Sequence, residues 1–93
     1  MGDCIKLFTT QGCEGCDIIK NLISKAIKET HAEKVDYEII DCLDHRYKPF
    51  LKFHKVEDFP ATFFISEGQV KNIILGTATS FIIAREIRKW FDI

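Results

Sequence analysis

The sequence lacks the features of a membrane protein, a secreted precursor or a nucleic-acid-binding protein. No stretch approaches the roughly 18 consecutive apolar residues that a membrane span needs. Gly2, Asp3 and Lys6 interrupt the N-terminal segment, so it does not have the apolar core of a signal peptide. The net charge is −1 with no long basic or acidic run, so nothing predicts binding to nucleic acid or to an anionic membrane. We therefore expect a cytoplasmic protein that binds neither nucleic acid nor a membrane.

Proline and glycine are also scarce, with two and five residues respectively, and no repeat, linker or low-complexity segment is present. A chain of 93 residues fits one domain, so residues 1–93 are expected to fold as a unit. A domain of this size buries roughly 60–65% of its unfolded surface, which is enough for one modest core. Eight phenylalanines predict that this core is rich in aromatic side chains.

Four cysteines are present, and the spacing of two of them is informative. In the cytosol, cysteines favour catalytic or metal-binding thiols over a structural disulfide framework. Cys13 and Cys16 form a Cys-x-x-Cys pair where a strand pattern gives way to a helix pattern. Taken alone, this pair fits a redox dithiol, half of a zinc or cluster site, or two inert cysteines. A closed zinc site needs four ligands, but Cys4 lies at the other end of the strand and the three histidines are scattered.

Hydrophobic periodicity predicts four strands and three helices. The expected strands are 4–9, 35–41, 61–65 and 69–75, and the expected helices are 13–30, 47–55 and 77–91. Two strands joined by a helix form a right-handed βαβ unit with parallel strands. Pro49 fits only a first helical turn, which places the start of the second helix near Tyr47.

The remaining turns also have sequence signals. The run Ser66-Glu67-Gly68 predicts a hairpin turn in which Gly68 takes positive φ, so the third and fourth strands must be antiparallel. Thr77 or Thr79 is expected to cap the final helix.

This βαβαββα order resembles the minimal thioredoxin fold, which glutaredoxins also use. Three stretches carry the resemblance: the strand–Cys13-Glu14-Gly15-Cys16–helix junction, the run 56–62 around Phe59-Pro60, and the hairpin that ends at Gly76. The resemblance implies an α/β protein with a four-stranded mixed sheet in the order 2-1-3-4, flanked by three helices. It also implies a thiol–disulfide oxidoreductase of the thioredoxin or glutaredoxin type.

The sequence departs from both subfamilies at several positions. Gly12 stands where a thioredoxin has tryptophan, and Leu7 stands where it has a buried acid. Glu14-Gly15 replaces the Pro-Tyr pair of dithiol glutaredoxins, and Gly76-Thr77 replaces their glycine pair.

The chemistry of a dithiol follows from its place at the start of a helix. Residues i and i+3 lie on the same side of a helix, within the Cα separation that a disulfide tolerates. Unpaired backbone N–H groups and the helix dipole should lower the pKa of Cys13 below that of a free thiol. Cys13 is then the nucleophile, and Cys16, which should be more buried, resolves the mixed disulfide. The charge of Glu14 opposes this effect and predicts a less acidic Cys13 and a more reducing couple.

The resemblance implies a substrate site opposite the thiols. Pro60 is expected to be cis and to leave the backbone of Phe59 free to pair with an extended peptide or with glutathione. The same site is expected to include Gly12, Gly76, Thr77 and Thr79.

The resemblance also implies the partners. These are oxidised protein substrates, such as ribonucleotide reductase, and a reductase or glutathione as electron donor. We expect a monomer with no tightly bound cofactor or metal. The alternative is a module that binds an iron–sulfur cluster or a metal through Cys13, across a dimer with glutathione. Cys42 follows the second strand and is a third redox thiol, a glutathionylation site or a small apolar filler.

Overall fold

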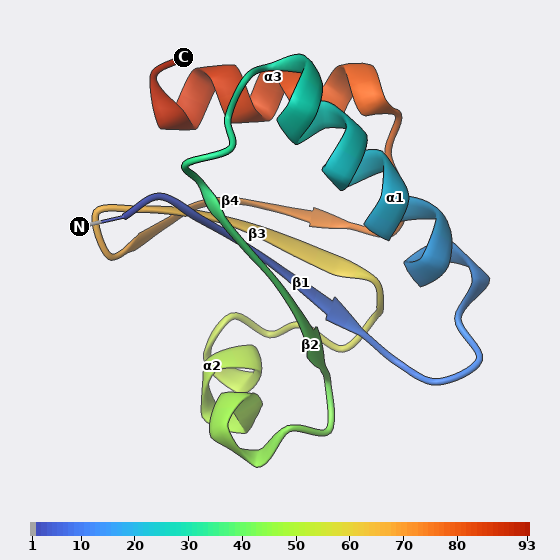
Figure 1. Ribbon diagram of the computed structural model, residues 1–93. Coiled ribbons are helices and arrows are strands. Elements are labelled where there is room, and N and C mark those ends of the chain that lie inside the picture. Colours follow the sequence, from blue (N-terminus) through green and yellow to red (C-terminus); the bar gives the residue numbers. More distant parts are fainter. Residues whose placement is uncertain (1) are drawn as a thin grey trace.

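The computed structural model describes residues 2–93, which form four strands, three α-helices and one 3-10 turn (Figure 1). In chain order the elements are β1 (Cys4–Thr9), α1 (Glu14–Glu29), β2 (Asp36–Asp41), η1 (His45–Tyr47), α2 (Lys48–Phe53), β3 (Ala61–Ser66), β4 (Gln69–Leu75) and α3 (Ser80–Phe91). The predicted element order is confirmed. The 3-10 turn η1, which leads into α2, was not predicted.

The strands form one mixed sheet in the order β2-β1-β3-β4. β1 pairs with β2 in parallel, whereas β3 pairs with β1 and with β4 in antiparallel fashion. Figure 1 shows α1 and α3 on one face of the sheet and α2 on the other. The predicted fold class, an α/β protein with sheet order 2-1-3-4 and three helices, is confirmed.

Two groups of buried apolar side chains hold these layers together. The first, here called the α1–α3 core, lies between the sheet and those two helices and includes Ile5, Leu7 and Phe64 from the strands. The second, the α2 core, lies on the opposite face and includes Phe8 and Phe63. Neighbouring residues of one strand enter different cores because side chains alternate along a strand. Phe8, Phe63 and Phe64 are fully buried, which confirms the expectation of an aromatic core.

The turns follow the expected residues, with one choice resolved. Gly68 takes a positive φ of 76°, and Glu67 before it takes 54°, so the hairpin turn has two left-handed residues. Thr79 caps α3, because its hydroxyl accepts a hydrogen bond from the Ile82 amide at 3.2 Å. Thr77, the other residue that the sequence offers as a cap, therefore does not cap α3.

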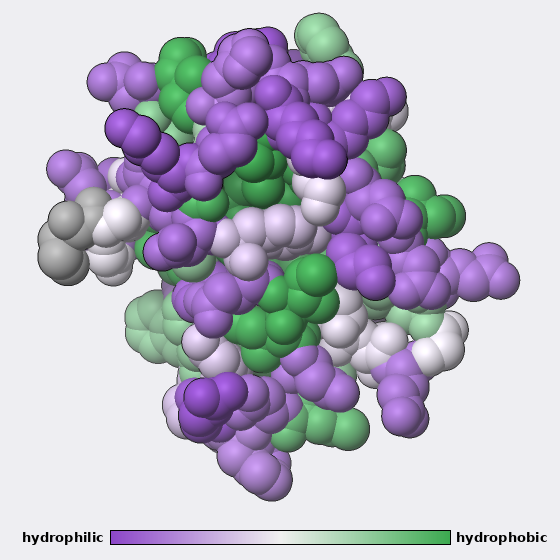
Figure 2. Space-filling view, in the orientation of Figure 1, coloured by the Kyte–Doolittle hydropathy of each residue, from purple (hydrophilic) through white to green (hydrophobic). Residues whose placement is uncertain are grey.

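The view in Figure 2 shows a largely hydrophilic surface with an apolar patch over β2. β2 is an edge strand, and Ile39 on it is 50% exposed. A small exposed apolar patch of this kind is normal on a protein surface and marks no site by itself. Across residues 2–93, no helix combines the length and the apolar character that crossing a membrane requires.

Candidate functional site

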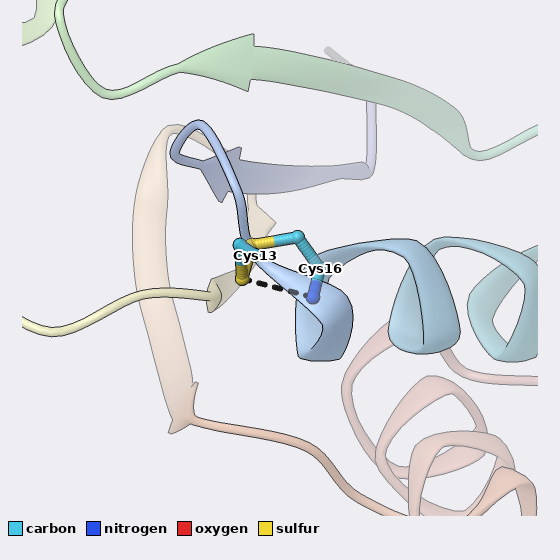
Figure 3. The surroundings of a disulfide bond; sticks show 2 residues. All are labelled: Cys13 and Cys16. Carbon is cyan, nitrogen blue, oxygen red and sulfur yellow. Dashed lines mark hydrogen bonds between the residues drawn. A yellow bond between two sulfur atoms is a disulfide. The ribbon is translucent and has the colours of Figure 1, made fainter.

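Cys13 and Cys16 are joined by a disulfide at the start of α1 (Figure 3). Their Cα atoms lie 5.2 Å apart, near the commonest separation for a disulfide. Cys16 is buried, with 4% of its surface exposed, whereas Cys13 is half-buried. The more exposed residue of the pair is thus the one that the sequence predicts to be the nucleophile.

The local backbone sets this arrangement. Gly12 has a φ of 65°, a left-handed conformation that glycine adopts without strain, and it turns the chain from β1 towards α1. Cys13 is the N-cap residue with extended φ and ψ, and its Sγ accepts a hydrogen bond from the Cys16 amide at 3.0 Å. In the reduced protein, a thiolate at this position would accept the same amide proton, which favours the charged form of Cys13.

Two further segments meet the Cys pair. A Cβ atom built on Gly15 would lie 3.2 Å from Thr77 Cγ2 and 3.5 Å from Pro60 Cδ, so the backbone between the two cysteines packs directly against both residues. The Gly76 amide donates a hydrogen bond to the Pro60 carbonyl at 2.8 Å. The Phe59–Pro60 peptide bond is cis, as the resemblance implies. In Figure 3 the segment that leads into β3 reaches the disulfide.

The structure therefore brings most of the predicted site residues together. Pro60 is buried, Phe59 is half-buried, and Thr77 is exposed to solvent. Thr79 is exposed, but its hydroxyl is already engaged in capping α3. The substrate-binding roles of these residues remain expectations based on position.

Charges near the disulfide are negative. Glu14 and Asp17 lie in the first turn of α1, and both are exposed. Carboxylates at a helix N-terminus interact favourably with the helix dipole, but they also repel a neighbouring thiolate. The site therefore combines a backbone that favours a thiolate with side chains that oppose it.

The other two cysteines lie apart from this site. The Cys42 amide donates to the Thr9 carbonyl at 2.8 Å, so Cys42 lies at the same end of the sheet as the Cys pair, but its side chain packs against the α2 core on the opposite face. Cys4 lies at the far end of β1, where burial raises the pKa of its thiol; the Glu38 and Asp36 carboxylates add to that increase and Lys6 reduces it. A thiol kept protonated in this way is a poor nucleophile.

Within residues 2–93, no three histidine, cysteine, aspartate or glutamate side chains are grouped so that they could hold a metal ion. A cluster or metal bound through Cys13 would therefore need ligands from other molecules.

Two features of the site were not predicted from the sequence. The contact of Gly15 with Thr77 and Pro60 depends on how three distant segments pack. Thr62, two residues after Pro60, is fully buried in β3. The available signal was a threonine inside the otherwise apolar run Ala61-Thr62-Phe63-Phe64-Ile65.

Comparison with known proteins identifies the fold. No protein-family model matches this sequence, and no curated protein sequence matches it either. Among solved structures, the chain is similar to thioredoxin-2, described as a component of malaria parasite protein secretion machinery. The TM-score is 0.78 at 12% identity, and the match covers 95% of this chain and 82% of that one.

Two further structures are similar over nearly the whole chain. A malarial protein matches with a TM-score of 0.76 at 12% identity, covering 97% of this chain and 98% of that one. Thioredoxin O2 from Arabidopsis thaliana, in its oxidised state, matches with a TM-score of 0.74 at 17% identity, covering 94% and 73%. The chain therefore has a thioredoxin fold, as expected. Identities this low show the fold alone.

Proposed function

We propose that this protein is a thiol–disulfide oxidoreductase that reduces protein disulfides, with Cys13 as nucleophile and Cys16 as resolving thiol. The observation that carries the proposal is the Cys13–Cys16 disulfide at the start of α1, packed against Pro60 through Gly15. A half-buried sulfur at a helix N-terminus with a buried sulfur one turn behind it is suited to two-step exchange.

The reaction moves two electrons from the dithiol to the substrate. The Cys13 thiolate attacks one sulfur of a substrate disulfide, and the other substrate sulfur leaves as a thiolate and takes up a proton. Cys16 then loses its proton and attacks Cys13 Sγ, which releases the second substrate sulfur. The protein is left with the disulfide that the structure contains.

Exposed apolar side chains beside Pro60 and at the start of α3 favour a polypeptide substrate. Leu75, which pairs with Ala61 next to Pro60, is 55% exposed. Phe81, in the first turn of α3, is 72% exposed, and Phe59 is half-buried. Burying such side chains against a partner is favourable, and an extended peptide is large enough to do so.

The charge around the site disfavours glutathione. Glu14 and Asp17 are exposed in the first turn of α1, and Glu57 and Asp58 are exposed just before Phe59. Glutathione carries a net negative charge at neutral pH and would be repelled by these carboxylates. We therefore propose a reductase, rather than glutathione, as the electron donor, for a monomeric protein working in the cytoplasm.

The test is reduction of insulin disulfides by the whole protein, with dithiothreitol, with thioredoxin reductase and with glutathione plus glutathione reductase as parallel electron donors. We expect turnover with dithiothreitol and with thioredoxin reductase, and much slower turnover with glutathione. Faster turnover with glutathione would contradict the proposed donor. No insulin reduction with any of the three would contradict the function itself.

Replacing Glu14 with glutamine is expected to lower the pKa of Cys13, because it removes one exposed negative charge beside a helix N-terminus. The reason is that the neutral side chain no longer repels the thiolate. The measurement is a titration of the reduced protein by thiolate absorbance, with Cys4 and Cys42 replaced by serine so that only the dithiol contributes.

The matched control for this prediction is Glu29→Gln, which removes the same charge at the opposite end of α1. It should leave the pKa of Cys13 unchanged. An unchanged or higher pKa of Cys13 in Glu14→Gln would show that Glu14 does not set the acidity of the nucleophile.

A further inference from the structure

A buried hydroxyl on β3 is without a hydrogen-bond partner. Thr62 has 0% of its surface exposed, and no group within residues 2–93 forms a hydrogen bond with its Oγ1. Buried polar side chains are nearly always hydrogen-bonded, because leaving water without gaining a partner is unfavourable. An exception in a small domain calls for a specific explanation.

The register of the sheet places Thr62 on the α1 side. In β3 it pairs with Leu7 of β1 and with Ile74 of β4. Side chains alternate along a strand, so Thr62 faces the same way as Phe64, which belongs to the α1–α3 core. Thr62 is thus the first residue after Pro60 that both belongs to β3 and faces α1.

Cys16 lies over the same end of the sheet. It is the first buried residue of α1, and the next one, Ile19, belongs to the α1–α3 core. Gly15 contacts Pro60, so the first turn of α1 packs against the start of β3. The Cys16 sulfur and the Thr62 hydroxyl therefore belong to the two segments that the contact between Gly15 and Pro60 brings together.

We propose that the Thr62 hydroxyl is the hydrogen-bond donor to the Cys16 sulfur once the disulfide is reduced, directly or through one water. The proposal rests on the proposed function, because only a dithiol that cycles presents a Cys16 thiolate. A disulfide sulfur is a weak acceptor, which agrees with the unpartnered Oγ1 of this oxidised form. A buried thiolate is a charged acceptor and needs a donor. Leu7, the strand partner of Thr62, offers no polar side-chain group.

The hydrogen bond acts in the resolving step. In the mixed disulfide, Cys13 Sγ is bonded to a substrate sulfur and Cys16 is a thiol. Cys16 gives its proton to solvent, its thiolate attacks Cys13 Sγ, and the bond from Cys13 to the substrate breaks as the Cys13–Cys16 bond forms. The substrate sulfur leaves with the electron pair and takes up a proton. A hydrogen bond from Thr62 lowers the pKa of Cys16 and so increases the fraction of Cys16 that is thiolate. A thiolate of lower pKa is a weaker nucleophile, but the larger thiolate fraction has the greater effect on the rate of attack.

The test separates the two chemical steps. Reduced protein carrying Cys4→Ser and Cys42→Ser is mixed with a slight excess of an aromatic disulfide that releases a coloured thiolate. The first release reports attack by Cys13, and the second reports resolution by Cys16. Thr62→Val removes the hydroxyl and keeps the side-chain shape, whereas Thr62→Ser keeps the hydroxyl.

We expect Thr62→Val to slow the second release by roughly three- to tenfold, the effect of one hydrogen bond. The pH midpoint of that release should rise, because the Cys16 thiolate is less stable. The first release should not change, and Thr62→Ser should restore the parent rate. Equal second releases in Thr62→Val and the parent at every pH would overturn the proposal, and so would equal slowing in Thr62→Ser.

These outcomes are distinguishable from a failure of the proposed function. If the parent protein shows no second release, the dithiol does not cycle and the oxidoreductase function is wrong. If Thr62→Val does not fold, Thr62→Ala replaces it, because the alanine and serine variants differ only in the hydroxyl.

Discussion

Replacing Cys13 with serine is expected to abolish insulin reduction, leaving only the rate of dithiothreitol alone. A serine hydroxyl stays protonated at neutral pH and does not attack a disulfide, whereas a thiolate at a helix N-terminus does. The fold should survive, because Cys13 is the N-cap residue of α1 and serine is among the preferred residues there. The measurement is insulin reduction at equal protein concentrations, with far-ultraviolet circular dichroism to verify folding.

Replacing Cys16 with serine should stop turnover in a different way. Cys13 can still attack the substrate, but no second thiol lies within reach to resolve the product. A mixed disulfide between Cys13 and the substrate should therefore accumulate, and mass spectrometry of the intact protein detects it. The contrast between the two variants assigns the nucleophile and the resolving thiol.

Cys42→Ser and Cys4→Ser are the matched controls. Cys42 packs against the α2 core on the opposite face of the sheet, and Cys4 lies at the far end of β1. Both variants should keep the parent rate. Activity that persists in Cys13→Ser and disappears on further replacement of Cys42 would move the nucleophile to Cys42.

The path of the chain could be predicted because each element carries a local signal. The Cys pair follows a β-branched run and precedes an amphipathic stripe, so the strand-to-helix junction was evident. Pro49 marked the first turn of α2, and Gly68 marked the hairpin. In each case the chemistry of one or two residues decides the local conformation.

The features that depend on register could not be predicted. A β-bulge between Phe64 and Ile65 shifts the pairing of β3 with β4, and no residue type marks it. Glu86 looks like a surface residue of α3, yet it is buried with 7% of its surface exposed. Its carboxylate accepts hydrogen bonds from Asn72 at 2.6 Å and Trp90 at 2.7 Å. Such burial becomes favourable only when both donors are brought to it by the fold.

The main residues of the site could be predicted from the sequence, but the contacts between them could not. The sequence identified both cysteines and Pro60, because the motif is local and the resemblance relates the two segments. It did not show that Gly15 packs against Thr77, or that Thr62 is fully buried opposite Leu7 in the sheet. Both depend on which residues face each other across three strands and a helix, and this is a property of the sheet register.

The α2 core packs on the face of the sheet opposite α1 and α3, and Phe63 contacts several of its aromatic residues. Its ring centroid lies 4.9 Å from that of Phe50, 5.3 Å from that of Phe8 and 5.3 Å from that of His54. The same core contains Val56, which precedes the Phe59-Pro60 segment. Phe63 therefore links α2 and the segment that carries Pro60 to the sheet.

Replacing Phe63 with alanine is expected to lower the free energy of unfolding by about 3–5 kcal/mol, the usual loss for a fully buried phenylalanine. This is a large part of the roughly 5–15 kcal/mol that stabilises a domain of this kind. Phe53→Ala is the matched control, because Phe53 lies in the same region with 79% of its surface exposed and should change stability by less than about 0.5 kcal/mol. The measurement is urea unfolding of the oxidised protein at constant m. Equal midpoints for the two variants would mean that the α2 core contributes little to stability, and that the Pro60 segment is held by its contacts with Gly15 and Gly76 instead.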